Sequence, residues 1–177
     1  MSVEGIILQA VSGLSMGMVM FIIAAGLSLI FGSLKVLNLA HGSFYMLGAY
    51  CCYWLATSFA HTPGIFWLTV IAAPIMVALF GGLVEVLLLR RIYAREMLYQ
   101  YILTFGLILV IGDICKLCWG SFYHNVLIPW PLGGAVPILG MLFPAYNIFL
   151  ICIGFIVFAG LWAMLRRTRL GRVIRTV

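Results

Sequence analysis

The feature of this sequence that most constrains its fold is a series of long apolar runs with very little charge. Residues 6–31 contain no Lys, Arg, Asp or Glu, and about 20 apolar residues in a helix are enough to cross the hydrocarbon core of a bilayer. Four further runs follow at residues 44–60, 65–89, 98–119 and 148–165. We therefore expect about five membrane segments.

The composition agrees with a chain that faces lipid. Apolar residues make up 66% of the 177 residues and charged residues only 8%, whereas soluble domains have roughly half and about a quarter. Such a chain cannot cover itself with polar surface in water, so its surplus apolar area must face lipid. We expect an all-α fold, a polytopic transmembrane helix bundle, with residues 1–177 forming a single transmembrane domain.

The positive charge gathers at the ends of two apolar runs. The formal net charge is +6, but the arginines lie between apolar runs and form no basic stripe interleaved with aromatics, so we expect no nucleic-acid partner. Arg90, Arg91 and Arg95 follow the third run. The tail after the fifth run contains Arg166, Arg167, Arg169, Arg172 and Arg175.

These clusters predict the orientation in the membrane, because short, positively charged connections stay in the cytoplasm. Residues 120–147, which are rich in Pro and Gly, contain no Lys or Arg and are expected outside. Alternating the five segments then puts the N-terminus outside and the tail in the cytoplasm. No Lys or Arg precedes the first run, so a cleaved signal peptide is not expected.

Polar residues and glycines interrupt the apolar pattern near residues 32–43. In lipid, irregular backbone is tolerated only where protein or water surrounds it, and transporters use interrupted helices to aim backbone dipoles at substrates. Spacing alone leaves two interpretations open, an interrupted helix beside a translocation pathway or an ordinary cytoplasmic turn. The candidate pathway residues are Asn38, Ala40, His41, Gly42 and Ser43. Gly42 is expected either to approach another backbone closely or to adopt a positive φ angle.

Charged and small residues inside the runs suggest packing contacts. Glu85 lies near the end of the third run and is expected to form a structural ion pair with Arg90 and Arg91, because an unpaired carboxylate in a membrane is costly. Asp113 and Lys116 have the i,i+3 spacing that places both on one helix face. Small residues at Gly13-x-x-x-Gly17 favour either a contact with a partner subunit or packing within the same bundle.

The sequence contains no arrangement that indicates catalysis or metal binding. It has no nucleophile–base pair, zinc signature or phosphate-binding loop, and its three histidines lie in different connections. Cys115-x-x-Cys118 has metal-ligand spacing but lacks a second pair of ligands. We expect no catalytic residue, metal or cofactor in this chain.

Several motifs occur in an order that resembles one family of transporters. Residues 38–42, Asn-Leu-Ala-His-Gly, and residues 44–50, Phe-Tyr-Met-Leu-Gly-Ala-Tyr, resemble the Asn-Phe-Ala-His-Gly signature and following helix of LivH-type permeases, the membrane subunits of branched-chain amino acid ABC importers. Residues 85–95, 104–107, 119–120 and 168–175 are similar to later motifs of that family. The chain departs from the pattern at Leu39, where Phe is usual, and in lacking a Pro in residues 85–95.

The resemblance implies a permease subunit that forms part of the translocation pathway and favours the interrupted helix at residues 32–43. It also implies that ATP is hydrolysed on a partner chain, so this chain is not itself an enzyme. The implied partners are a second permease subunit, two cytoplasmic ATPase subunits and an extracytoplasmic solute-binding protein, in addition to the lipid of a prokaryotic inner membrane. The tail arginines (Arg166, Arg167, Arg169, Arg172 and Arg175) are then expected to face the ATPase.

Other functions stay open from the sequence. Related permeases carry urea, short amides or other amino acids. A channel is a second alternative, because Asn38-x-Ala40 resembles the half-helix loops of water channels, although those need a second copy of the motif. A membrane anchor that does not transport is a third. LivH-type permeases continue beyond the position of Val177, so the chain is expected to be the N-terminal part of a longer permease.

Overall fold

The computed structural model of the chain describes residues 3–34, 36, 38–62, 64–126, 128–129, 132–138, 140–168 and 171. Its five α-helices are α1 (Val3–Leu34), α2 (His41–Ser58), α3 (Ile65–Leu87), α4 (Met97–Trp119) and α5 (Ala145–Arg167). A 3₁₀ turn, η1 (Leu89–Arg91), follows α3, and two short strands, β1 (Ala135–Ile138) and β2 (Met141–Pro144), precede α5. The prediction of a polytopic helical bundle is confirmed, with the small hairpin as an addition to it.

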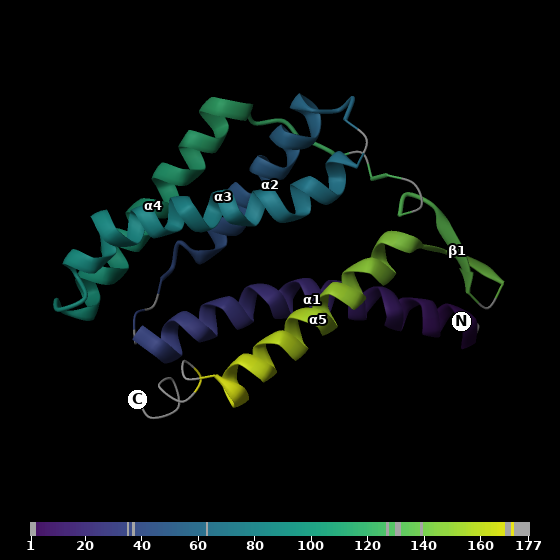
Figure 1. Ribbon diagram of the computed structural model, residues 1–177, viewed down its shortest axis with the longest axis horizontal. Coiled ribbons are helices and arrows are strands. Elements are labelled where there is room, and N and C mark those ends of the chain that lie inside the picture. The colour runs from purple at the N-terminus through teal and green to yellow at the C-terminus, as the bar shows by residue number, and fades with distance from the viewer. Residues whose placement is uncertain are drawn as a thin grey trace. The chain divides into compact units, whose positions relative to one another are not determined.

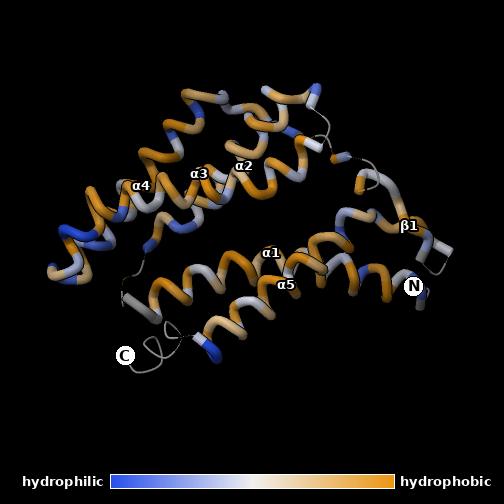
Figure 2. Tube along the Cα trace, viewed as in Figure 1, coloured by the Kyte–Doolittle hydropathy of each residue, from blue (hydrophilic) through white to orange (hydrophobic). Residues whose placement is uncertain are grey.

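Among the described residues, four segments are long and apolar enough to cross a membrane: Glu4–Gly32, Ile65–Arg91, Met97–Trp119 and Ala145–Arg167. The fifth helix, α2, has 18 residues, which corresponds to about 27 Å at 1.5 Å per residue. Hydrophobic residues recur along each helix (Figure 2). Large apolar side chains such as Leu79 and Ile156 are exposed. This surface suits lipid and not water, as expected of a multi-pass membrane protein.

The chain divides into two compact units. One unit, Lys35–Leu127, contains α2, α3, η1 and α4. The other consists of Met1–Leu34 and Ile128–Val177 and contains α1, the β hairpin and α5. Figure 1 shows the helices of each unit, and the contacts described below lie within one unit or the other.

In the first of these units, α2 packs against both α3 and α4. The α2–α3 pair is antiparallel, because Phe44 packs on Phe80 near the start of α2 and Cys51 packs with Ala73 further along it. The α2–α4 pair is parallel. Ser43 and Ile108 line one cavity near the start of α2, and Tyr50 stacks on Trp119 further along both helices, with ring centroids 5.3 Å apart.

In the other unit, α1 and α5 also pack side by side in the same direction. The closest approach is at Gly154, where an added Cβ would lie 2.7 Å from the Cβ of Met18. One turn later, the rings of Phe21 and Phe158 have centroids 5.9 Å apart. The predicted small-residue motif is not used here, because a Cβ added at Gly13 or Gly17 would meet no atom within 4 Å in the described chain.

The β hairpin occupies part of the Pro/Gly-rich connection before α5. Its strands are antiparallel, with Ala135 opposite Pro144 and Pro137 opposite Leu142. Gly140, between the strands, has φ +80°, a left-handed conformation that glycine adopts without a steric penalty. The prediction that this connection is not a continuous helix therefore agrees with its backbone.

Candidate functional site

Asn38 organises the last turn of the connection between α1 and α2. Helix α1 ends at Leu34 and α2 begins at His41. The Asn38 side-chain Oδ1 accepts a hydrogen bond from the Ala40 backbone N–H at 3.0 Å, and the Asn38 carbonyl accepts one from the His41 N–H at 3.2 Å. An asparagine side chain that bonds the backbone two residues later forms a compact turn. Asn38 thus shapes the backbone that leads into α2.

Three of the predicted pathway residues, Asn38, Ala40 and Ser43, are buried in the unit that contains α2, α3 and α4. Asn38 is only 6% exposed, and Ala40 is fully buried. Ala40 packs in a core cluster that also contains Val84, Leu107 and Ile111. His41 is half-buried at the first position of α2. The turn therefore anchors α2 to its neighbours through Ala40.

The expectation that Gly42 approaches another backbone closely or adopts a positive φ angle is wrong. Gly42 lies in the first turn of α2, and the described glycines with positive φ are Gly64, Gly120 and Gly140. A Cβ added at Gly42 would meet no atom within 4 Å in the described residues. The absence of a side chain here leaves open space beside α2, with no close backbone contact.

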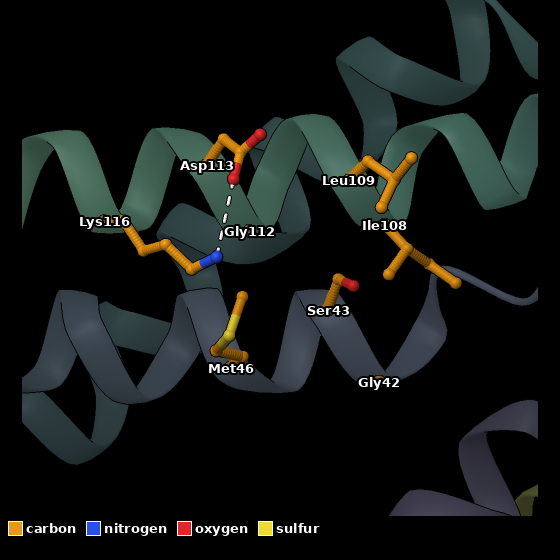
Figure 3. Close-up of a pocket in the computed structure, with 8 residues that line it drawn as sticks. All are labelled: Gly42, Ser43, Met46, Ile108, Leu109, Gly112, Asp113 and Lys116. Carbon is orange, nitrogen blue, oxygen red and sulfur yellow. Dashed lines mark ion pairs between the residues drawn. The ribbon is translucent and has the colours of Figure 1, made fainter. Parts of the chain in front are cut away.

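That open space belongs to a cavity of about 300 Å³ between α2 and α4. Figure 3 shows the residues around it, with the side chains of Ser43 and Met46 directed from α2 towards α4. Helix α4 supplies two aliphatic residues, a glycine and two charged residues. The complete lining is Gly42, Ser43, Met46, Ile108, Leu109, Gly112, Asp113 and Lys116. Glycines on both helices, Gly42 and Gly112, keep the cavity from being filled by side chains.

Asp113 and Lys116 form an ion pair at the edge of this cavity. The Lys116 Nζ lies 3.5 Å from the Asp113 Oδ1, so the pairing predicted from the i,i+3 spacing is confirmed. The side chains remain 72% and 63% exposed, respectively. Figure 3 shows the Lys116 side chain extending from α4 towards α2, with its ammonium group directed at one oxygen of Asp113. The cavity therefore has two opposite charges at one end and an apolar wall of Met46, Ile108 and Leu109.

A second ion pair lies at the end of α3. The Arg90 Nε is 3.6 Å from the Glu85 Oε1, and the Tyr93 hydroxyl donates a hydrogen bond to the same oxygen at 3.5 Å. Burial and then the neighbouring Glu85 carboxylate raise the pKa of Tyr93, which keeps the hydroxyl protonated as a donor. Among the described residues, Arg91 makes no ion pair with Glu85.

The predicted ATPase-facing arginines are described only in part. Arg166 and Arg167 are exposed in the last turn of α5. The Arg166 guanidinium carbon lies 5.1 Å from the ring centroid of Trp162, a cation–π contact that holds its side chain against the helix. Arg169, Arg172 and Arg175 lie outside the described residues.

An aromatic cluster at the end of α2 and α4 was not predicted from the sequence. The His124 Nε2 donates a hydrogen bond to the Trp119 carbonyl at 2.8 Å, and the His124 ring centroid is 4.3 Å from that of Tyr53. The Tyr50 ring lies between the two helices against Trp119. The spacing of Tyr50 and Tyr53 in the sequence could have indicated this cluster. From the sequence, both residues were expected only as part of the apolar run at residues 44–60.

The described residues contain no group of three or more His, Cys, Asp or Glu side chains that could hold a metal ion. Cys115 and Cys118 carry free thiols, and Cys115 is buried in the core between α2 and α4. The polar side-chain groups of the candidate site are therefore the Asp113–Lys116 ion pair and the hydroxyl of Ser43. These groups can bind and orient a small polar solute.

Comparisons with known proteins identify the family. The chain is 27% identical over 175 residues to the high-affinity branched-chain amino acid transport system permease protein BraD of Pseudomonas aeruginosa. It is 25% identical over 179 residues to the corresponding permease protein LivH of Salmonella typhimurium and of Salmonella typhi. These matches cover 94% of this chain and 57% of each relative, so the chain spans little more than half of their length.

No solved structure matches the chain. The sequence profile that does match is described as branched-chain amino acid transport system, permease component, and it covers residues 9–177. This range includes all five helices except the first two turns of α1. The chain belongs to the family of branched-chain amino acid transport system permease components.

Proposed function

We propose that this protein is a membrane-spanning permease subunit of an ATP-binding-cassette importer for branched-chain amino acids and forms part of its translocation pathway. The observation that carries the proposal is the family match along residues 9–177. ATP is hydrolysed on a partner chain. The partners are a second permease subunit, two cytoplasmic ATPase subunits and an extracytoplasmic solute-binding protein, assembled in the inner membrane of a prokaryote.

ATP-dependent uptake by the complete importer tests this function. Proteoliposomes that contain this chain with its partner subunits are expected to accumulate radiolabelled L-leucine only when ATP and the solute-binding protein are present. Uptake of urea or a short amide in place of leucine, isoleucine and valine would assign a different substrate class. Solute flux that does not depend on ATP would indicate a channel, and failure of an ATPase to copurify would indicate a membrane anchor.

The candidate pathway has two parts that act differently. Gly42 and Ser43 line the cavity between α2 and α4. They are the residues proposed to border the translocation pathway directly. Asn38, Ala40 and His41 form the turn that sets where α2 begins. Asn38 and Ala40 do not line the cavity, so they act on the pathway through the position of α2.

Filling the cavity from Gly42 tests this assignment. Gly42→Val is expected to reduce uptake strongly while leaving expression and melting temperature nearly unchanged, because the Cβ added there would meet no atom within 4 Å in the described residues. Gly82→Val is the matched control, since Gly82 is also helical, also has no atom within 4 Å of an added Cβ, and lies on α3 away from the cavity. Equal uptake by both variants would remove Gly42 from the pathway.

The arginine-rich ends are proposed to lie in the cytoplasm, following the distribution of positive charge in membrane proteins. This places η1 and the end of α5 on the inner side, and the N-terminus and the β hairpin on the outer side. Arg166 and Arg167, together with Arg169, Arg172 and Arg175, then face the ATPase subunits. The exposure of Arg166 and Arg167 at the end of α5 supports this contact.

A further inference from the structure

Among the residues that the structure describes, Asp113 and Lys116 form an ion pair with each other beside the cavity. Both charged groups belong to α4, and both line the cavity facing α2. Asp113 lies six positions before the end of α4 at Trp119, about 9 Å along the helix axis. Charged groups at this depth are costly in lipid and usually face a protein or water-filled space on a solute pathway.

We infer that Asp113 and Lys116 recognise the zwitterionic head of an amino acid in this cavity, an assignment that rests on the proposed transport function. The Asp113 carboxylate would bind the α-ammonium group, and the Lys116 ammonium would bind the α-carboxylate. Met46, Ile108 and Leu109 supply an apolar wall for the aliphatic side chain of the solute. Ser43 adds a hydroxyl at the α2 side of the cavity.

Charge balance favours a zwitterion over other small solutes. A zwitterion brings one positive and one negative group, so each member of the Asp113–Lys116 pair gains an opposite charge and the cavity stays neutral. A solute with a single charge can compensate only one member of the pair and leaves the site with a net charge. A neutral amide offers no charge to either residue. The pair therefore selects for solutes that carry both charges.

The size of the cavity agrees with a single small solute. Its volume of about 300 Å³ is at the lower end of the range of roughly 300–1,000 Å³ usual for small-molecule sites. Gly42 and Gly112 contribute to this space, because an added Cβ at either position would meet no atom within 4 Å. Met46 is flexible enough to adapt to aliphatic side chains of different shape.

The neutral double variant Asp113→Asn/Lys116→Gln tests the inference in the complete importer. It removes both charges without leaving one of them unpaired, and leucine uptake is expected to fall by about tenfold or more because two charged hydrogen bonds to the solute are lost. Recovery of the assembled importer is expected to match the wild type. The control Glu85→Gln/Arg90→Gln removes the other ion pair, which does not line this cavity, and should transport leucine.

Exchanging the two charges separates recognition from structure. Asp113→Lys/Lys116→Asp keeps an ion pair at the same spacing, so a purely structural pair predicts normal uptake. Recognition predicts that uptake is lost, because the solute would have to reverse and turn its aliphatic side chain away from the apolar wall. Wild-type uptake by the neutral or the exchanged variant would overturn the inference and leave the proposed transport function intact. A wild-type importer that transports no amino acid would overturn both.

Binding can also be measured directly at Ser43. In a cysteine-free background, the rate at which a thiol reagent modifies Ser43→Cys is expected to fall when L-leucine is present. Two analogues share its side chain but carry one charge each: 4-methylpentanoate lacks the ammonium group, and 3-methylbutylamine lacks the carboxylate. Neither should protect the thiol, and leucine should not protect it when Asp113→Asn/Lys116→Gln is also present. Equal protection by all three compounds would contradict recognition by the charged pair.

Discussion

Asn38 determines the local path of the chain at the start of α2. Its side-chain carbonyl accepts the buried Ala40 N–H, and this places Ala40 in the core with Leu107 and Ile111. The first turn of α2 then presents Gly42 and Ser43 to the cavity. From its position in a polar motif, Asn38 was a candidate to line the translocation pathway. In the structure its side chain instead binds the Ala40 backbone N–H.

This arrangement predicts a graded loss of stability at position 38. Asn38→Ala leaves the buried Ala40 N–H without its acceptor and should lower the free energy of unfolding by about 1 kcal/mol. Asn38→Ser should lose less, because a hydroxyl can accept a similar bond more weakly. Melting temperatures of the purified protein in detergent give the comparison. Identical melting temperatures for the Ala variant and the wild type would show that the turn does not depend on this bond.

The site shows which residue contacts can be predicted from a sequence. The Asp113–Lys116 pair follows from spacing because both residues lie on one helix. Gly42 and Gly112 lie on different helices and line the same cavity. This arrangement depends on how α2 packs against α4, which no local sequence pattern predicts. The sequence suggested only the backbone freedom of glycine for Gly42, and that reason is wrong.

At the scale of elements, Gly154 controls how closely α1 and α5 approach. A Cβ at this position would lie 2.7 Å from the Met18 Cβ, an atom that cannot move away by a change of rotamer. The helices would have to separate, which would also disturb the Phe21–Phe158 contact one turn later. Small residues at such crossings allow helices to pack closely in membranes.

Gly154→Ala and Gly160→Ala are therefore predicted to have opposite effects on stability. The first should destabilise the protein by roughly 1–3 kcal/mol through overpacking. The second should be neutral or slightly stabilising, because Gly160 has no atom near an added Cβ and alanine favours the helix. Thermal unfolding in detergent measures both. A destabilised Gly160 variant or a stabilised Gly154 variant would contradict the described α1–α5 packing.

The helices themselves were predictable because apolar length is a local property of the chain. The runs at residues 65–89 and 98–119 nearly coincide with α3 and α4. The run at 44–60 missed the first turn of α2, since His41, Gly42 and Ser43 are not apolar. The hairpin was not predicted, because the Pro and Gly residues of residues 120–147 exclude a helix but do not specify which residues pair across the strands.

At the scale of the whole molecule, the direction of α5 relative to α1 bears on how many times the chain crosses the membrane. The two helices run in the same direction, since Met18 faces Gly154 and Phe21 contacts Phe158 one turn later. Two helices that cross the membrane in the same direction must be separated by an odd number of other membrane crossings. Because α3 and α4 are long and apolar enough to supply two, we expect α2 to supply the third, although it is shorter than the other helices.

The parallel packing of α2 with α4 and its antiparallel packing with α3 agree with this count. With the arginine-rich end of α5 in the cytoplasm, α1 then begins outside and the connection before α2 lies inside. If α2 did not cross the membrane, the start of α1 would lie inside and the connection before α2 would lie outside. The positions of η1 and the β hairpin would stay the same, so only the N-terminus and the connection before α2 distinguish five crossings from four.

Thiol labelling of intact cells with a membrane-impermeant reagent measures this difference. In a cysteine-free background, Glu4→Cys is expected to be labelled and Leu39→Cys to react only after the membrane is made permeable, since both side chains are exposed in the folded chain. Ala94→Cys, beyond η1, and Tyr123→Cys, beyond α4, serve as inside and outside references and are also exposed. The reverse result, labelling at position 39 and protection at position 4, would show that α2 stays on one side of the membrane and that α1 and α5 cross in opposite directions.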